Sequence, residues 1–105
     1  MDVWVMAGTY ENDPFVSVHL TEKYALIAAI HDLMEFLGTE DLADFETRFG
    51  SEVADNDGDY FPARGLQELE APQLRPVFAA WTELDGVWDN CMGYSITVMK
   101  SRMQA

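Results

Sequence analysis

Two runs of apolar residues near the start of the chain have the two-residue period of β-strands. They cover residues 3–6 and 15–20, and the connection between them, residues 8–14, is rich in turn formers. This connection is too long for a tight two-residue turn. The pattern therefore predicts a hairpin with a longer loop. The apolar side chains on one face of the second run are Val16, Val18 and Leu20.

A helical period replaces this alternation over residues 22–37. Thr21 is a suitable N-cap and Gly38 a suitable residue just beyond the C-terminus, with no strong helix breaker between them. The apolar arc covers about half of the helical wheel, which predicts packing against both a sheet and another helix. Its members are Leu26, Ile27, Ala29, Ile30, Leu33, Met34, Phe36 and Leu37. The opposite side carries His31, Asp32 and Glu35.

Two further helices are predicted in the middle of the chain. Thr39 can cap a helix that ends at Gly50, with carboxylates in its first turn that suit the positive end of the helix dipole. The polar, turn-rich residues 51–65 predict an irregular segment. The third helix is predicted to begin with Pro76 at its first position, where the missing N–H costs nothing, and to end near Gly86.

The last apolar alternation, over residues 94–100, predicts a strand that completes a small antiparallel sheet with the opening hairpin. Its apolar side carries Tyr94, Ile96 and Val98. The predicted order is strand, strand, helix, helix, helix, strand, with an additional helical turn over residues 66–70. Because strands and helices are segregated along the chain, we predict a single α+β domain over residues 1–105, in which the sheet packs with about three helices.

Composition adds a strong negative charge to this picture. Six Lys and Arg against 19 Asp and Glu give a net charge of −13, which repels phosphate and anionic lipid, so direct binding to nucleic acid or membrane is disfavoured. No apolar run approaches the roughly 20 residues of a membrane helix, and the start of the chain lacks the basic region of a signal peptide. Cys91 is the single cysteine, which agrees with a reducing compartment. We therefore expect a cytoplasmic protein.

Negative charge is concentrated between residues 32 and 59, which hold ten carboxylates and one arginine. Anionic groups displayed on a helix and the loop after it can stand where a nucleic acid presents phosphates, and can enter a groove lined by Lys and Arg. Aromatic rings beside acids, as at Tyr10, would add specific contacts. A face kept acidic for solubility is the alternative explanation. The predicted partner-binding residues are Asp32, Glu35, Glu40, Asp41, Asp44, Glu46, Asp55, Asp57, Asp59, Tyr60 and Trp88.

The sequence offers little for catalysis or metal binding. Residues 55–59 alternate oxygen ligands, but in an EF-hand register Tyr60 stands where Gly is needed and Leu66 where Glu is needed. The other candidates for acid–base or nucleophilic chemistry share no motif spacing, and they are His19, His31 and Cys91. We therefore expect neither an enzyme nor a bound metal or cofactor.

In size, charge and the acidic cluster of residues 32–59, the chain resembles the small acidic inhibitors made by bacteriophages and mobile elements. These include anti-restriction and anti-CRISPR proteins, some of which imitate DNA. The resemblance implies an inhibitor that occupies the basic groove of a nucleic-acid-binding protein inside a host cell. It transfers no site residues to this chain.

Three other functions are compatible with the same sequence. An immunity protein that neutralises a basic toxin would carry a similar acidic surface. A metal-dependent enzyme or a calcium-binding module would use the loop of residues 52–59. A structural component would self-associate through an exposed edge of the sheet.

Overall fold

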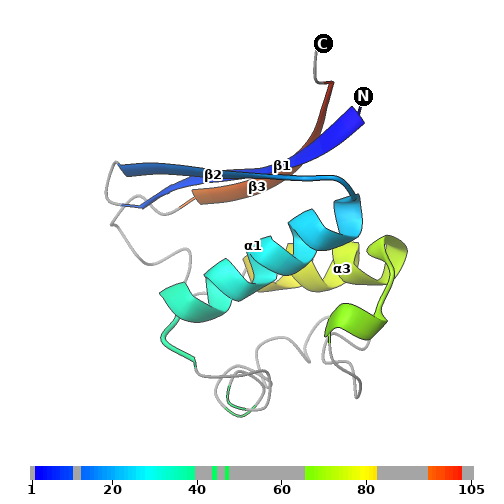
Figure 1. The fold of residues 1–105 in the computed structure, drawn as a ribbon. Helices are drawn as coiled ribbons and strands as arrows, with labels where there is room; N and C mark the ends of the chain where they lie inside the picture. The colour runs from blue at the N-terminus through cyan, green and yellow to red at the C-terminus, as the bar shows by residue number, and fades with distance from the viewer. Residues whose placement is uncertain are drawn as a thin grey trace.

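The computed structural model describes residues 2–10, 13–39, 44, 47, 66–82 and 95–102. In this part of the chain a three-stranded antiparallel sheet forms one layer and helices form the other (Figure 1). The elements are β1 (Asp2–Tyr10), β2 (Asp13–His19), α1 (Glu22–Phe36), the 3₁₀ turn η1 (Leu66–Glu68), α3 (Ala71–Thr82) and β3 (Ser95–Arg102). The α+β class agrees with the sequence-based prediction.

The prediction of about three helices is wrong. The described residues form two α-helices and one 3₁₀ turn, in the order β, β, α, 3₁₀, α, β. Thr39, the predicted cap of a second helix, instead belongs to the end of α1, because its hydroxyl donates to the carbonyl oxygen of Met34 at 2.9 Å. The rest of that predicted helix, apart from residues 44 and 47, lies outside the described residues.

The C-terminal strand joins the sheet of the opening hairpin, as predicted, and the strand order β2-β1-β3 shows that it pairs with the first strand. The hairpin differs from its prediction, because β1 continues to Tyr10 and β2 already begins at Asp13, with only residues 11 and 12 between them. Turn-forming residues are thus absorbed into paired strands. Pro14 is accommodated because β2 is an edge strand of the described sheet, where a missing N–H need not break a ladder.

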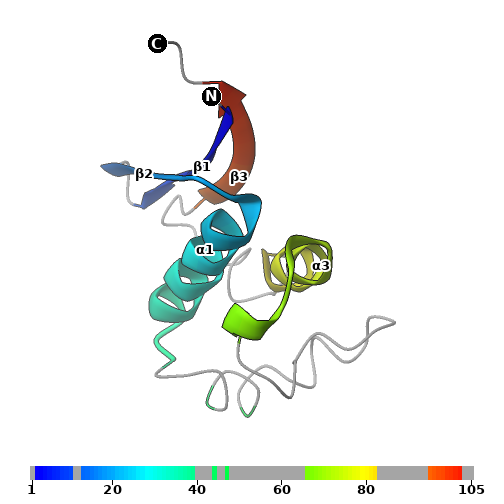
Figure 2. The same cartoon turned by 45° about the vertical axis from the view of Figure 1, so that its right-hand side comes forward.

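The register divides the sheet into two faces with different surroundings. On one face Met6, Phe15, Ile96 and Val98 contribute to the core under α1. Side chains alternate along a strand, so the neighbouring positions point away from the helices. We call this second surface the open sheet face, and its residues are Val3, which is buried, with Val5, Ala7, Thr9, Pro14, Val16, Val18, Ser95, Thr97, Met99 and Ser101. The apolar alternation predicted for β2 is therefore present, but Val16 and Val18 lie on the side without a helix (Figures 1 and 2).

Helix α1 follows its prediction closely because its two ends are defined by local hydrogen bonds. The Thr21 hydroxyl accepts from the Tyr24 backbone N–H at 3.3 Å. At the other end, the Gly38 N–H donates to the Glu35 carbonyl and the Thr39 N–H to the Met34 carbonyl, which is the Schellman arrangement. Gly38 has a φ of 74°, a conformation that glycine adopts without a Cβ penalty.

Helix α3 starts earlier than predicted. The backbone N–H of Glu70 donates to the Gln73 side-chain oxygen at 2.9 Å, and the Glu70 carbonyl accepts the first helical hydrogen bonds, so the helix begins at Ala71. Pro76 consequently lies inside the helix, not at its first position. The helix continues past it because Leu74 and Val77, on either side, are completely buried in the core.

The core lies between the sheet and α1, and α3 packs beside α1 (Figure 2). At the surface of the protein, two ion pairs join the start of α1 to the start of α3. Arg75 binds the Glu22 carboxylate with two nitrogens, at 2.8 Å and 2.5 Å, and Lys23 approaches Glu70 at 3.6 Å. The buried members of the main cluster are Met6, Leu26, Ile27, Ala29, Ile30, Leu33, Met34, Leu66, Leu74, Val77 and Ile96.

Candidate functional site

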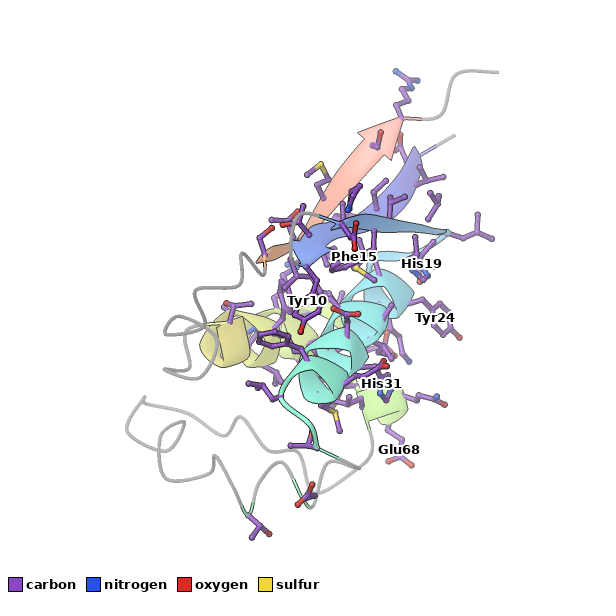
Figure 3. All side chains as sticks on the ribbon, turned by 90° about the vertical axis from the view of Figure 1, so that its left-hand side faces the viewer. Tyr10, Phe15, His19, Tyr24, His31 and Glu68 are labelled. Carbon is purple, nitrogen blue, oxygen red and sulfur yellow. The ribbon has the colours of Figure 1, made fainter. Side chains whose placement is uncertain are left out.

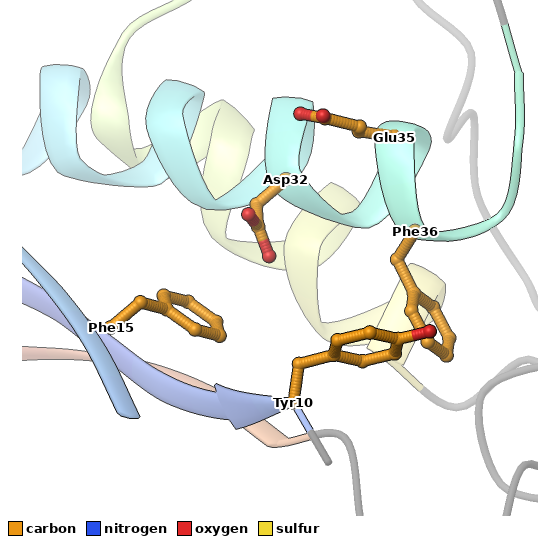
Figure 4. Close-up of a pocket in the computed structure, with 5 residues that line it drawn as sticks. All are labelled: Tyr10, Phe15, Asp32, Glu35 and Phe36. Atoms are coloured by element: carbon orange, nitrogen blue, oxygen red, sulfur yellow. The ribbon is translucent and has the colours of Figure 1, made fainter. Parts of the chain in front are cut away.

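A pocket of about 420 Å³ lies between the sheet and the C-terminal half of α1 (Figure 4). This volume is within the range of small-molecule and side-chain binding pockets, about 300–1,000 Å³. The described residues that line it are Tyr10, Phe15, Asp32, Glu35 and Phe36. Three aromatic rings therefore share one concave surface with two carboxyl groups.

The two rings from the sheet are placed by the hairpin register. Tyr10 is the last residue of β1 and pairs with Asp13, while Phe15 stands directly across from Gly8. A Cβ added to Gly8 would lie 2.7 Å from the Phe15 ring and would collide with the Ser95 carbonyl oxygen. The glycine therefore leaves the space that the Phe15 ring occupies over β1, at the inner side of the pocket.

The other three residues are placed by the period of α1. Glu35 and Phe36 follow Asp32 by three and four residues, so each of them lies next to Asp32 on the helix surface. The Phe36 ring meets the Tyr10 ring edge to face, with 5.6 Å between centroids and 76° between planes. Asp32 is half-buried and points towards the sheet between Phe15 and Tyr10, whereas Glu35 is exposed and extends along the helix (Figure 4).

The electrostatics of this pocket favour a cation. Both carboxyl groups lie close to the C-terminus of α1, where the helix dipole already places partial negative charge, and the last turn contains no basic residue. The faces of the aromatic rings are also electron-rich and attract cations within about 6 Å of the ring centre. None of the five lining residues is positively charged. An ammonium or guanidinium group would therefore be stabilised by carboxylate and ring together.

The structure brings together two of the predicted partner-binding residues, Asp32 and Glu35. A third, Asp44, is half-buried in a helical conformation. The remaining predicted residues lie outside the described residues, and they are Glu40, Asp41, Glu46, Asp55, Asp57, Asp59, Tyr60 and Trp88. The loop of residues 52–59, considered above as a calcium or catalytic site, also lies outside them.

Sequence reasoning missed most of the aromatic part of the pocket. Tyr10 was considered because acids flank it, but Phe15 and Phe36 were expected only as apolar strand and helix residues. The available signal was the helical spacing of Phe36 from Asp32. Residues one turn apart on a helix lie on the same face. The spacing alone therefore predicts that the Phe36 ring and the Asp32 carboxylate are neighbours.

The two histidines considered for acid–base chemistry lie on different elements, and Cys91 lies outside the described residues. His19 lies on β2, with its Nε2 atom 2.7 Å from the Ser17 hydroxyl, and His31 is exposed on α1 (Figure 3). Within the described residues, no group of three or more His, Cys, Asp and Glu side chains has the arrangement needed to hold a metal ion.

The described helices, α1 and α3, lack the combination of length and hydropathy that spanning a membrane requires. Comparisons with protein-family models, with curated proteins and with solved structures give no significant match for this chain.

Proposed function

We propose that this chain is an acidic binding protein that captures a basic protein partner, and that the pocket beside α1 receives a cationic side chain of that partner. The observation that carries this proposal is the position of the half-buried Asp32 between the Phe15 and Tyr10 rings. A carboxylate between aromatic rings supplies charge attraction and stacking surface for the same guest.

An arginine side chain has the best chemical match to this pocket. Its guanidinium group is planar, stacks on aromatic faces and is less strongly hydrated than an ammonium group. It can present two N–H donors to one carboxylate, which Asp32 offers from α1. Glu35, exposed on the next turn of the helix, would attract the cation before it enters.

The proposed partner is a nucleic-acid-binding protein with a groove lined by Lys and Arg. The net charge of −13 would steer such a partner towards the chain, and a groove built for phosphates would accept carboxylates in their place. The proposal therefore describes an inhibitor that competes with nucleic acid for the groove. It involves binding alone, without a catalytic step, metal or cofactor.

The pocket can be tested with a pair of small probes that differ in charge alone. N-acetyl-arginine methylamide and its neutral citrulline analogue have nearly the same shape. NMR titration of the full chain should give saturable shifts at Tyr10, Phe15 and Phe36 with the arginine probe and not with the citrulline probe. Equal shifts with both probes, or no shifts with either, would refute the cation site.

Matched variants separate the pocket from the general negative charge. Asp32→Asn removes the carboxylate inside the pocket, and we expect it to weaken binding of the arginine probe at least fivefold. Glu68→Gln removes one negative charge from the exposed residue Glu68 of η1, away from the pocket, and should leave probe binding unchanged (Figure 3). If the two variants weaken binding equally, long-range charge and not the pocket explains the affinity.

The partner class is tested by capture from host cells on the immobilised chain and on its Asp32→Asn variant. We expect a basic nucleic-acid-binding protein that is retained at low salt, released at high salt and displaced by double-stranded DNA. A captured basic toxin that is not displaced by DNA would instead identify an immunity protein. Partners without basic surfaces would overturn the proposal.

A further inference from the structure

The open sheet face carries a continuous apolar row across all three strands. Val5 of β1 pairs with Val18 of β2 on one side and with Met99 of β3 on the other. In the adjacent row Ala7 pairs with Val16 and Thr97. Large apolar side chains here are accessible to solvent, with exposed fractions of 67% for Val16, 56% for Val18, 51% for Met99 and 74% for Leu20, which follows β2. Clustered exposed apolar residues of this kind mark interaction surfaces.

This face is also without charge, in a chain of which 24% of the residues are charged. All eleven of its residues are apolar, serine or threonine. The helices lie on the other side of the sheet (Figure 1), and the acids that they carry include Glu22, Asp32 and Glu35 of α1 and Glu68 of η1. The molecule thus separates an acidic helical side from an uncharged sheet side.

We propose that the open sheet face binds a second copy of this chain, so that two sheets pack face to face in a reversible homodimer. A twofold axis brings the same surface of both copies together, which a self-complementary apolar face allows. The product is a four-layer arrangement of helices, sheet, sheet and helices. Alternating side chains of the two inner faces would interdigitate as they do in a β-sandwich, with about 10 Å between the sheets.

The distribution of charge favours a second copy over the basic partner at this face. A basic partner would find no carboxylate there, whereas the acidic helical side offers several. Two copies with a charge of −13 each repel one another, but this packing turns the described helical acids outwards, to opposite ends of the dimer. The repulsion that remains acts over more than the Debye length of about 8 Å at physiological salt and is largely screened.

The size of the face sets the strength of the dimer. Three strands spaced by about 4.8 Å, with seven to nine residues rising about 3.3 Å each, span roughly 14 Å by 23–30 Å. This is smaller than the about 800 Å² per partner of a stable interface. We therefore expect a dimer that dissociates in the micromolar to millimolar range, in rapid exchange with the monomer.

Sedimentation equilibrium of the full chain over a wide concentration range tests this proposal. The average mass should rise from 11.9 kDa towards twice that value as concentration increases. Added salt should strengthen the association, because it screens like charges. Binding of a basic partner should respond in the opposite way, so failure of one proposal can be distinguished from failure of the other. A mass of 11.9 kDa at every concentration and salt would overturn the dimer.

Two matched variants locate the contact. Val18→Glu places a charge in the apolar row and should prevent dimerisation. Tyr24→Glu makes the same gain of charge at an exposed aromatic residue of α1 and should leave the dimer intact. Association that survives Val18→Glu, or that Tyr24→Glu abolishes, would contradict the assigned face.

A measurement on the unmodified chain covers the case in which Val18→Glu fails to fold. A soluble paramagnetic compound relaxes the methyl groups that it can reach. At high protein concentration the Val16 and Val18 methyl groups should become protected, while the exposed Tyr24 ring should not. Unchanged accessibility of both valines across the concentration range would overturn the proposal.

Discussion

Gly8 is the residue on which both the sheet and the pocket depend most directly. It stands in the central strand, across from Phe15 in β2 and Ile96 in β3. Its missing side chain allows the Phe15 ring and the Ser95 carbonyl to approach the β1 backbone closely. Because the Phe15 ring packs against the core and also lines the pocket, a change at Gly8 would affect both.

Replacement of Gly8 by alanine should therefore be costly. The new methyl group would lie 2.7 Å from the Phe15 ring and would collide with the Ser95 carbonyl oxygen, a backbone atom that cannot move without disturbing the sheet. We expect a loss of about 1–3 kcal/mol in the free energy of unfolding, as for other overpacked sites. Urea denaturation measures it, with Ser101→Ala at an exposed strand position as the control that should change stability by less than about 0.5 kcal/mol. Equal effects of the two substitutions would contradict the close packing at Gly8.

At the scale of elements, the two helices are joined by one well-formed ion pair. Arg75 donates to the Glu22 carboxylate with two nitrogens, and these hydrogen bonds, with the attraction of the guanidinium charge, hold the pKa of Glu22 below its usual value. A carboxyl group with a lowered pKa in the folded state stabilises the protein when it is ionised. The contribution is present above the pKa of the unfolded chain and is lost as pH falls through the lowered pKa.

The substitution Glu22→Gln should consequently lower the melting temperature at neutral pH. The difference from the unmodified chain should narrow in acid and vanish below the pKa of Glu22 in the folded state, because both side chains are then neutral. Thermal melts from neutral to strongly acidic pH measure it. A difference that persists at the acidic end would show that packing, and not ionisation, accounts for the effect.

Helix α3 contains a second test, because Pro76 removes a hydrogen bond from its interior. Pro76 is exposed, so alanine there leaves the buried side chains in place and restores the N–H donor. Alanine also gives the unfolded chain more conformational freedom than proline, which opposes this gain. We expect a net increase of about 1–2 kcal/mol in the free energy of unfolding. Pro72→Ala, in the first turn, removes no such defect and should have little effect. A loss of stability in Pro76→Ala would mean that the proline shapes the helix for its packing.

The ends of the elements show what the sequence could and could not predict. The bounds of α1 were predictable because Thr21 and Gly38 act on the backbone next to them. The extension of β1 to Tyr10, and the start of α3 before Pro76, were not, because strand pairing and burial of Leu74 and Val77 outweigh local preference. For the pocket, the sequence indicated the acids, whereas the Phe15 ring is placed by a register that only the folded hairpin defines.

At the scale of the whole molecule, the excess of acids should make stability depend on salt. Self-repulsion at a net charge of −13 opposes the compact state, and screening relieves it. In dilute solution at neutral pH, the melting temperature should rise with added sodium chloride. Near the isoelectric point of about 4.1 the same addition should have little effect. If salt raised stability equally at both pH values, charge repulsion would not be its cause.

The pocket is lined by side chains that are close together in the sequence as well as in space. All five described lining residues fall between positions 10 and 36, in β1, β2 and α1, and none comes from α3 or β3. Contacts between residues of small sequence separation form quickly, because only short loops must close. The lining contacts therefore belong to one unit of β1, β2 and α1, whose assembly requires only short loops to close.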